Sequence, residues 1–176
     1  MLFTLLRMDT YLAVASKREV RRYDARPLPD DAVRRILEAG RVTGSSRNRQ
    51  ARRFVVLRDS ALVERTAATV HVPSNVLGAA LVVVIVTGRK GPTAFDAGRA
   101  AQNMMLAASN DGIGSCPNGI ADPETLAPIV GATEEQLATV LTFGYPTRPA
   151  DPSRHSADEW IARADRLPFD EVVQVR

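Results

Sequence analysis

Apolar and polar positions along this chain form two different patterns, one typical of helices and the other typical of buried strands. Val33, Ile36 and Leu37 recur at helical spacing and form one face of a predicted helix over residues 29–40. That helix has acids in its first turn and a glycine at its end, the usual signals for helix termini. Residues 79–86 are instead a continuous Val-rich run, typical of a central strand buried on both faces.

The same rules predict the other elements of one α+β domain over residues 1–176, with residues 1–8 as a disordered leader before an alternative start at Met8. Further helices are expected at residues 9–16, 61–69, 93–111, 123–131 and 158–164, and further strands at 53–57, 136–143 and 171–175. Residues 112–119 are punctuated by Gly and Pro, which predicts a loop.

The predicted strand at 171–175 is isolated at the end of the chain. Roughly 27 residues of helix and loop separate it from the strand before it. A tail of this kind is a candidate for reaching across to the sheet of a second subunit.

Charge is distributed unevenly along the chain. Residues 17–58 contain 13 Lys and Arg against 5 Asp and Glu, a local excess of +8, whereas the remainder holds 10 against 15. This pattern indicates an anionic partner, either nucleic acid or a phosphorylated small molecule. The chain lacks the aromatic interleaving and the helix-turn-helix or zinc-finger spacing of nucleic-acid modules, which favours the small molecule.

Cysteine and histidine are too sparse for several common kinds of site. Cys116 is the single cysteine, and His71 and His155 lie far apart, so neither a disulfide framework nor a structural zinc site is expected. The longest apolar run, residues 79–86, is too short to cross a membrane. We therefore expect a soluble, cytoplasmic protein without a metal.

Two polar clusters are the strongest candidates for a binding site. The first, residues 17–22, reads KREVRR, and the second, residues 45–50, reads SSRNRQ. A solvated surface is the alternative for either cluster alone. Together they predict a site for a ligand with a phosphate at one end and a hydrogen-bonding ring at the other.

These clusters and four further segments resemble, in order, the FMN-dependent nitroreductase family, over nearly the whole chain. Family members carry an early R-R-S-x-R-x-[FY]-D motif, which resembles KREVRRYD at residues 17–24, and a P-S-x-x-N-x-Q-P-W segment, which resembles GSSRNRQAR at 44–52. The other matching segments are the proline-flanked helix at 27–39, AGRAAQNMML at 97–106, GIGSC at 112–116, and LTFGYP at 141–146 followed by RLP at 166–168.

The resemblance implies a three-layer sandwich with a mainly antiparallel central sheet flanked by helices, and a homodimer that exchanges its C-terminal strand and binds FMN at the interface. It also implies roles for particular residues. Lys17, Arg18 and Arg21 would bind the phosphate and the ribityl chain of FMN, and Arg166 would bind the same phosphate. Glu19 lies inside this motif. Ser45, Asn48 and Gln50 would hydrogen-bond to the ribityl hydroxyls and to the edge of the isoalloxazine ring. From the other subunit, Pro117, Asn118 and Gly119 would pass beside the ring and offer a backbone N–H.

The implied activity is transfer of hydride from NAD(P)H to FMN and then of electrons to a nitroaromatic- or quinone-like acceptor, in a ping-pong cycle without a catalytic side chain. The expected partners are a second subunit and a small-molecule acceptor, with no nucleic acid and no membrane. Two departures from the family pattern, Glu19 in place of Ser and Arg52 in place of Trp, leave open an alternative: a protein that binds flavin or another phosphorylated ligand without turnover.

Overall fold

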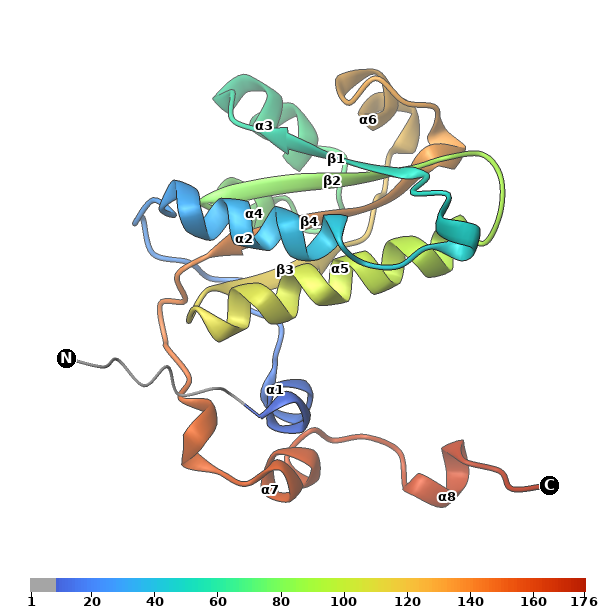
Figure 1. Cartoon of the computed structure of the whole chain (residues 1–176). Coiled ribbons are helices and arrows are strands. Elements are labelled where there is room, and N and C mark those ends of the chain that lie inside the picture. The colour runs from blue at the N-terminus through green and yellow to red at the C-terminus, as the bar shows by residue number, and fades with distance from the viewer. Residues whose placement is uncertain (1–8) are drawn as a thin grey trace. The chain divides into compact units, whose positions relative to one another are not determined.

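The structure of this protein is a computed structural model that describes residues 9–176, so the leader predicted at residues 1–8 lies outside the described residues. The described chain divides into two compact units, one made of residues 18–149 and the other of residues 9–17 and 150–176 (Figure 1). The expectation of a single domain over residues 1–176 stays a prediction.

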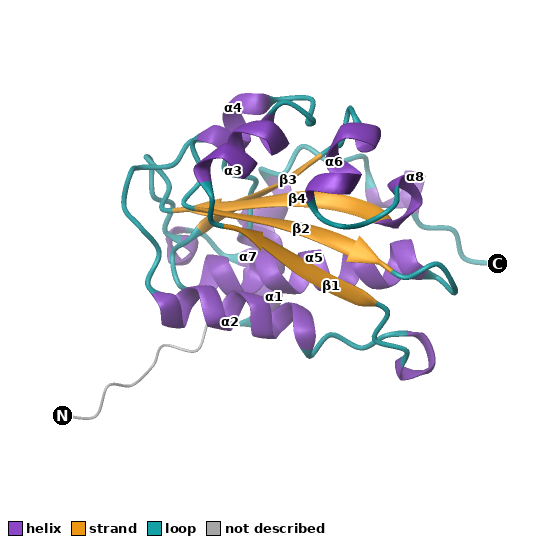
Figure 2. Cartoon of the chain, turned by 90° about the horizontal axis from the view of Figure 1, so that it is seen from above, coloured by secondary structure: helices purple, strands orange, loops and turns teal. Residues whose placement is uncertain are grey.

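The unit formed by residues 18–149 is built on a four-stranded antiparallel sheet (Figure 2). The strand order is β1-β2-β4-β3. The strands are β1 (Arg52–Leu57), β2 (Leu81–Thr87), β3 (Gly114–Asn118) and β4 (Leu137–Gly144). Three of them confirm the strands predicted near 53–57, 79–86 and 136–143.

Helices cover both faces of this sheet and make three layers, as predicted (Figures 1 and 2). On one face lie α2 (Asp30–Arg41) and α5 (Thr93–Asn110). On the other lie α3 (Ser60–Ala67), α4 (Pro73–Leu77) and α6 (Pro123–Ile129). Of these, only α4 was not predicted; Pro73 occupies its first turn, where a missing N–H costs nothing.

Strand β2 supplies side chains to both cores. Val83 and Ile85 pack against the layer of α2 and α5, whereas Val82 and Val84 pack against α3, α4 and α6. All its residues are buried, which explains why its sequence is a continuous apolar run instead of an alternating one. A strand buried on both faces fixes the positions of the loops at its two ends.

The second unit contains short helices. They are α1 (Thr10–Ser16), the 3-10 helix Pro152–Arg154, α7 (Ala157–Ala162) and α8 (Phe169–Val172). Within this unit α1 packs against α7. Trp160 of α7 donates from its indole Nε1 to the carbonyl of Pro152 at 2.9 Å, and its ring meets the edge of His155.

The prediction of a loop over residues 112–119 is wrong, because residues 114–118 form β3. This segment lacks an alternating apolar pattern, and it is a strand because its backbone pairs with β4, from Gly114 with Gly144 to Asn118 with Val140. Pairing with a long neighbour thus overrides a composition that is typical of loops.

The prediction of a strand at residues 171–175 is also wrong for the single chain. Residues 169–172 form α8, and the backbone becomes extended only at Val173. A terminal segment with no strand of its own chain beside it has no partner for its backbone hydrogen bonds. The exchange of this segment between two subunits stays a prediction.

Within residues 9–176, every helix is too short or too polar to span a bilayer. The same residues contain no group of three or more His, Cys, Asp or Glu side chains that could hold a metal ion.

Candidate functional site

The basic segment that follows residue 17 is extended and is held against the sheet by its backbone. Val20 N–H donates to the Ser115 carbonyl at 2.9 Å, and Thr147 N–H donates to the Arg22 carbonyl at 3.2 Å. The side chain of Val20 points inward. It lies so close to Gly114 that an added Cβ there would come within 2.7 Å of Val20, so this approach requires a glycine.

The predicted phosphate ligands of this segment lie at or near the surface. Arg21 and Glu19 are exposed, and Arg18 is half-buried. Exposure allows Glu19 to turn away from a phosphate bound by its neighbours. The placement therefore suits an anion site at Arg18 and Arg21.

Tyr23 anchors the far end of this segment. Its hydroxyl donates to the Val20 carbonyl at 2.6 Å and lies 3.1 Å from Thr142 Oγ1 of β4. Burial raises the pKa of the Tyr23 phenol well above its usual value, because the charged form would lose its hydration. Tyr23 is thus a neutral hydrogen-bonding anchor that fixes the position of Arg21.

The second predicted cluster, residues 45–50, is a tight loop that its own residues hold together. Gln50 N–H donates to Ser45 Oγ at 2.8 Å. Arg47, Asn48 and Gln50 all have φ near +50°, a left-handed conformation that is uncommon outside glycine. Such strained positions often occur at ligand-binding loops.

The side-chain amides of this loop are available for a ligand. Asn48 and Gln50 are exposed, and within the described part of the chain neither amide group has a hydrogen-bond partner. Each carries both donor and acceptor atoms. Ser45 is half-buried and, although its oxygen accepts from Gln50, its hydroxyl can still donate.

Two further contacts brace the loop from outside. Ser46 N–H donates to Asp96 Oδ2 in the first turn of α5 at 3.0 Å. Behind the loop, Arg52 donates from Nη2 to the carbonyls of Gly40 and Thr43, at the end of α2. The sequence identified Arg52 only as a departure from the family pattern, whereas the structure gives it the role of holding the corner that leads into the loop.

The side chain of Asn118, in the segment 117–119 that was predicted to offer a backbone N–H, is buried. Asn118 is only 5% exposed, and its amide nitrogen donates to the carbonyls of Cys116 and Val140, both at 3.1 Å. Its amide oxygen accepts from Asn75 at 3.0 Å. Since this side chain is committed to the interior, any contact with a ligand would come from the backbone and from the exposed Pro117 and Gly119.

His71 lies against Gly119, and sequence reasoning gave it no role. His71 N–H donates to the Gly119 carbonyl at 3.1 Å, and its imidazole lies directly over this glycine. The two residues are 48 positions apart, and no spacing signal connects them.

The predicted site residues thus form separate groups within one chain. Pairing of Val20 with Ser115 brings Arg18 and Arg21 beside the strand that carries Pro117 and Asn118. The loop at 45–50 is instead fixed to Asp96, near the opposite end of α5 from β3. Asp96 and Asn110 are 14 residues apart in this helix, which is about 21 Å at 1.5 Å per residue.

Lys17 and Arg166 belong to the other unit. Lys17 follows the last turn of α1, and Arg166 is exposed and donates to the Ala164 carbonyl at 2.7 Å. The convergence of both with Arg18 and Arg21 stays a prediction.

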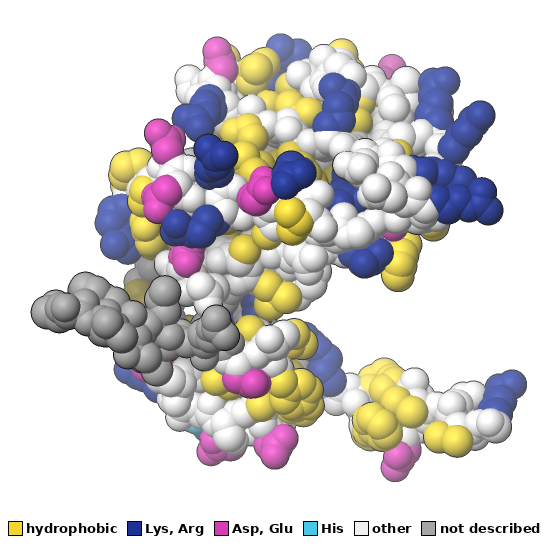
Figure 3. Space-filling view, viewed as in Figure 1, with side chains coloured by type: hydrophobic (Ala, Val, Ile, Leu, Met, Phe, Trp, Pro, Cys, Tyr) yellow, Lys and Arg dark blue, Asp and Glu magenta, His cyan; other side chains and the backbone are white. Residues whose placement is uncertain are grey.

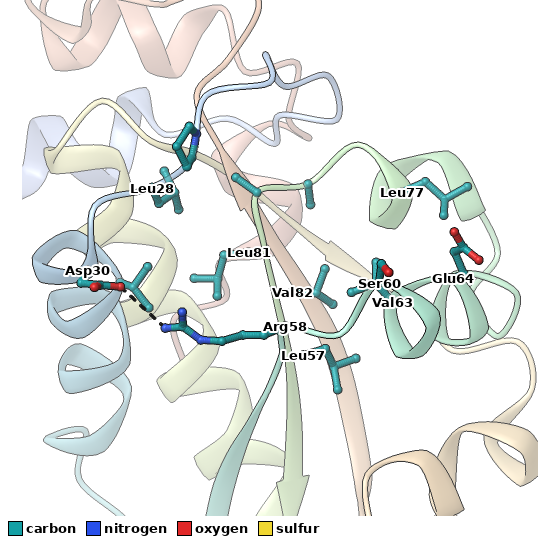
Figure 4. A pocket seen from close by; sticks show the side chains of 14 residues that line it. Leu28, Asp30, Leu57, Arg58, Ser60, Val63, Glu64, Leu77, Leu81 and Val82 are labelled. Atoms are coloured by element: carbon teal, nitrogen blue, oxygen red, sulfur yellow. Dashed lines mark ion pairs between the residues drawn. The ribbon is translucent and has the colours of Figure 1, made fainter.

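A pocket of about 480 Å³ lies elsewhere in residues 18–149, between the start of α2, the end of β1, α3 and α4 (Figure 4). Its apolar lining includes Val63 and Leu81, and Arg58 extends across it toward Asp30, with the two charged groups 3.8 Å apart. Both side chains are largely exposed, so this ion pair is weak. None of the predicted cofactor residues lines this pocket.

The sequence of this chain matches a family model and the sequences of known proteins. The model of the nitroreductase family matches residues 14–89 and 74–145. A "Putative NADH dehydrogenase/NAD(P)H nitroreductase" of Methanothermobacter thermautotrophicus is 24% identical over 170 residues, which cover 88% of this chain and 89% of the relative.

Two solved structures share the fold. A crystal structure described as a "putative nitroreductase in complex with fmn" from Desulfovibrio desulfuricans has a TM-score of 0.80 and 26% identity, and covers 96% of this chain and 97% of its own. The NADPH:FMN oxidoreductase of Vibrio harveyi, complexed with NAD+, has a TM-score of 0.76 and 22% identity, and covers 93% of this chain and 75% of its own. Since the family model spans residues 14–145, which are 132 of the 176 residues, the chain belongs to the nitroreductase family.

Proposed function

We propose that this protein is a homodimeric, FMN-dependent NAD(P)H oxidoreductase that reduces nitroaromatic- or quinone-like acceptors in a ping-pong cycle. Membership of the nitroreductase family supports an oxidoreductase. The FMN complex of the Desulfovibrio relative, at 26% identity over almost the whole chain, supports the cofactor.

The donor groups of this chain suit FMN. Arg18 and Arg21 carry guanidinium groups on a segment that is anchored by its backbone, and such groups are suited to holding a phosphate with two parallel hydrogen bonds. We assign Lys17 and Arg166 to the same phosphate. The ring edge of FMN presents both donors and acceptors, and the exposed amides of Asn48 and Gln50 match both.

One observation carries the proposal of a dimer: the two groups of predicted ligands lie near opposite ends of α5, about 21 Å apart along the helix. In a twofold-symmetric dimer, the loop at 45–50 of one subunit can approach Arg18 and Arg21 of the other. Each site would then need both copies of the chain.

When bound, FMN supplies the ring that takes up hydride and passes electrons to the second substrate. The chain's own residues bind and orient. Arg18 and Arg21 would hold the phosphate, the amides of Asn48 and Gln50 would bind the ring edge, and the exposed Pro117 and Gly119, at the end of β3, would lie beside the ring. We assign no proton transfer to a side chain.

A flavin-binding protein without turnover is the second candidate. Arg52 favours it, since a polar side chain occupies a position where the family pattern has an aromatic residue. The same experiment separates the two candidates.

The experiment is an absorption spectrum of the purified protein before and after incubation with FMN, followed by anaerobic addition of NADH or NADPH. We expect a bound flavin that is bleached rapidly and is reoxidised by a quinone. A protein that stays colourless after incubation with FMN would refute flavin binding. Bound flavin that neither nucleotide bleaches would leave only the binding role.

A further inference from the structure

Two loops lie side by side at the edge of the sheet where β1 begins and β2 ends. Gly88 N–H donates to the Ala51 carbonyl at 2.7 Å, which joins the residues after β2 to the loop at 45–50. Gly91, with φ near +96°, lies against the guanidinium of Arg49, and an added Cβ there would overlap Arg49 Nη1. The glycine therefore allows the Arg49 side chain to lie across the second loop.

This arrangement gathers four cations, Arg47, Arg49, Arg89 and Lys90, which we call the cationic patch. All four are exposed. Figure 3 shows Lys and Arg side chains concentrated at this end of the sheet. Among the described residues, none of the four lies within ion-pair distance of a carboxylate.

The carboxylates near the patch are already engaged. Asp96 accepts from Ser46 N–H and lies 4.0 Å from Arg99. Glu135 accepts from Thr133 Oγ1 at 2.8 Å, and its pKa is lowered chiefly by that hydrogen bond, with a smaller effect of Arg89. Like charges gathered on these two joined loops, with only a minor interaction between Arg89 and Glu135 to offset them, repel one another, and a bound anion relieves that repulsion.

We propose that the cationic patch binds the 2′-phosphate on the adenosine half of NADPH and makes the protein prefer NADPH to NADH. This inference rests on the proposed function, because the patch includes Arg47 and Arg49 of the loop assigned to the flavin. With the nicotinamide on a flavin beside this loop, the adenosine half would extend toward Arg89 and Lys90, because the bond from Gly88 to Ala51 joins their loop to residues 45–50. A phosphate monoester brings the additional negative charge that NADH lacks.

The test compares both nucleotides in the FMN-loaded protein and in an Arg89→Gln, Lys90→Gln double variant, which leaves residues 45–50 unchanged. We expect the ratio of kcat/KM for NADPH to that for NADH to fall roughly tenfold or more, mainly through a higher KM for NADPH. In the unaltered protein, added salt should raise the KM for NADPH more than the KM for NADH.

Arg65→Gln is the matched control, since Arg65 is an exposed arginine on α3, outside both loops. It should leave the ratio unchanged. The proposal is overturned if the double variant keeps the wild-type ratio of kcat/KM for NADPH to that for NADH. If that variant also loses salt-sensitive binding of duplex DNA, the patch binds nucleic acid instead.

Direct binding tests the patch even without turnover. Adenosine 2′,5′-bisphosphate should bind the purified protein more tightly than 5′-AMP, and the double variant should remove the difference. Equal affinity for the two ligands would contradict the patch while leaving the proposed function intact. If neither nucleotide bleached the flavin while the difference in affinity persisted, the proposed function would be contradicted and the patch would remain a binding site for the 2′-phosphate.

Discussion

Ser46 N–H donates to the carboxylate of Asp96 at 3.0 Å, across 50 positions of sequence, and this bond fixes the loop at 45–50 to the start of α5. Asp96 is mostly buried, with a side chain only 15% exposed. A carboxylate in the first turn is also favourable for the helix dipole. The one side chain therefore serves both the helix and the loop.

We predict that Asp96→Ala weakens FMN binding roughly tenfold, because the loop that presents Asn48 and Gln50 loses its external support and must be ordered on binding. Asp96→Asn, which keeps an acceptor oxygen, should retain most of the affinity. Titration of FMN followed by flavin fluorescence measures both. Asp31→Ala, in the first turn of α2 and remote from the loop, is the control. Equal affinity for all three variants would show that the loop needs no support from α5.

Arg21→Ala should weaken FMN binding by about 1.5–3 kcal/mol, because it removes a charge-assisted hydrogen bond to the phosphate. Glu19→Ser should leave the affinity the same or raise it, since a carboxylate near the phosphate repels it. Both residues are exposed, so neither change should disturb the packing of Val20. Wild-type affinity in Arg21→Ala would mean that the phosphate binds elsewhere.

Asn48 and Asn118 provide a matched pair of asparagines with different roles. Asn118→Ala should destabilise the fold by about 2–3 kcal/mol, because the buried Asn75 amide loses its acceptor and the Val140 carbonyl loses a donor. Asn48→Ala should instead leave the melting temperature nearly unchanged and weaken FMN binding. Thermal melts of the protein without FMN, together with FMN titrations, check both. The opposite pattern would show that Asn118, and not Asn48, faces the cofactor.

Tyr23→Phe should cost about 1 kcal/mol at neutral pH, because the hydrogen bonds to Val20 and Thr142 are lost. The raised pKa of Tyr23 adds a dependence on pH. The folded state holds the phenolic proton more tightly than the unfolded state, so the contribution is complete below pH 10 and is lost as pH rises from there toward the raised pKa.

Urea unfolding at pH 8 and pH 10.5 tests this dependence. Wild type should lose more stability than Tyr23→Phe between these two values, since the variant has no phenol to ionise at this position. Equal losses in the two proteins would show that Tyr23 is not the group responsible.

The sequence predicted the layers of the fold well, because Ile36 follows a helical period and Val83 lies in a continuous apolar run, and burial accounts for both patterns. It failed where long-range pairing decides the structure. Residues 114–118 are a strand only because β4 lies beside them, and residues 169–172 are helical, in a unit whose described residues contain no strand.

The candidate site shows the same division between local and long-range information. The sequence motifs predicted that Arg21, Asn48 and Gln50 bind the same ligand. The supports provided by Asp96 and Arg52 depend on contacts across 50 and 9 or more positions, respectively, that carry no signal in a single sequence. The burial of Asn118 was equally hidden, since Asn-Gly is a common turn dipeptide.

Removal of residues 167–176 should convert the proposed dimer into a monomer. Within the second unit this tail exposes large apolar side chains, with Phe169 72% and Val175 96% accessible. Such a run of exposed apolar residues is typical of a segment that packs on another subunit. Light scattering of the truncated and full-length proteins measures the change. Replacing Phe169 and Val172 with Ser in the full-length chain should weaken the dimer in the same direction. Because Arg166 remains in the truncated protein, a loss of FMN binding there would show that the cofactor site depends on the dimer. A truncated protein that is still dimeric and still binds FMN would show that this tail is needed for neither.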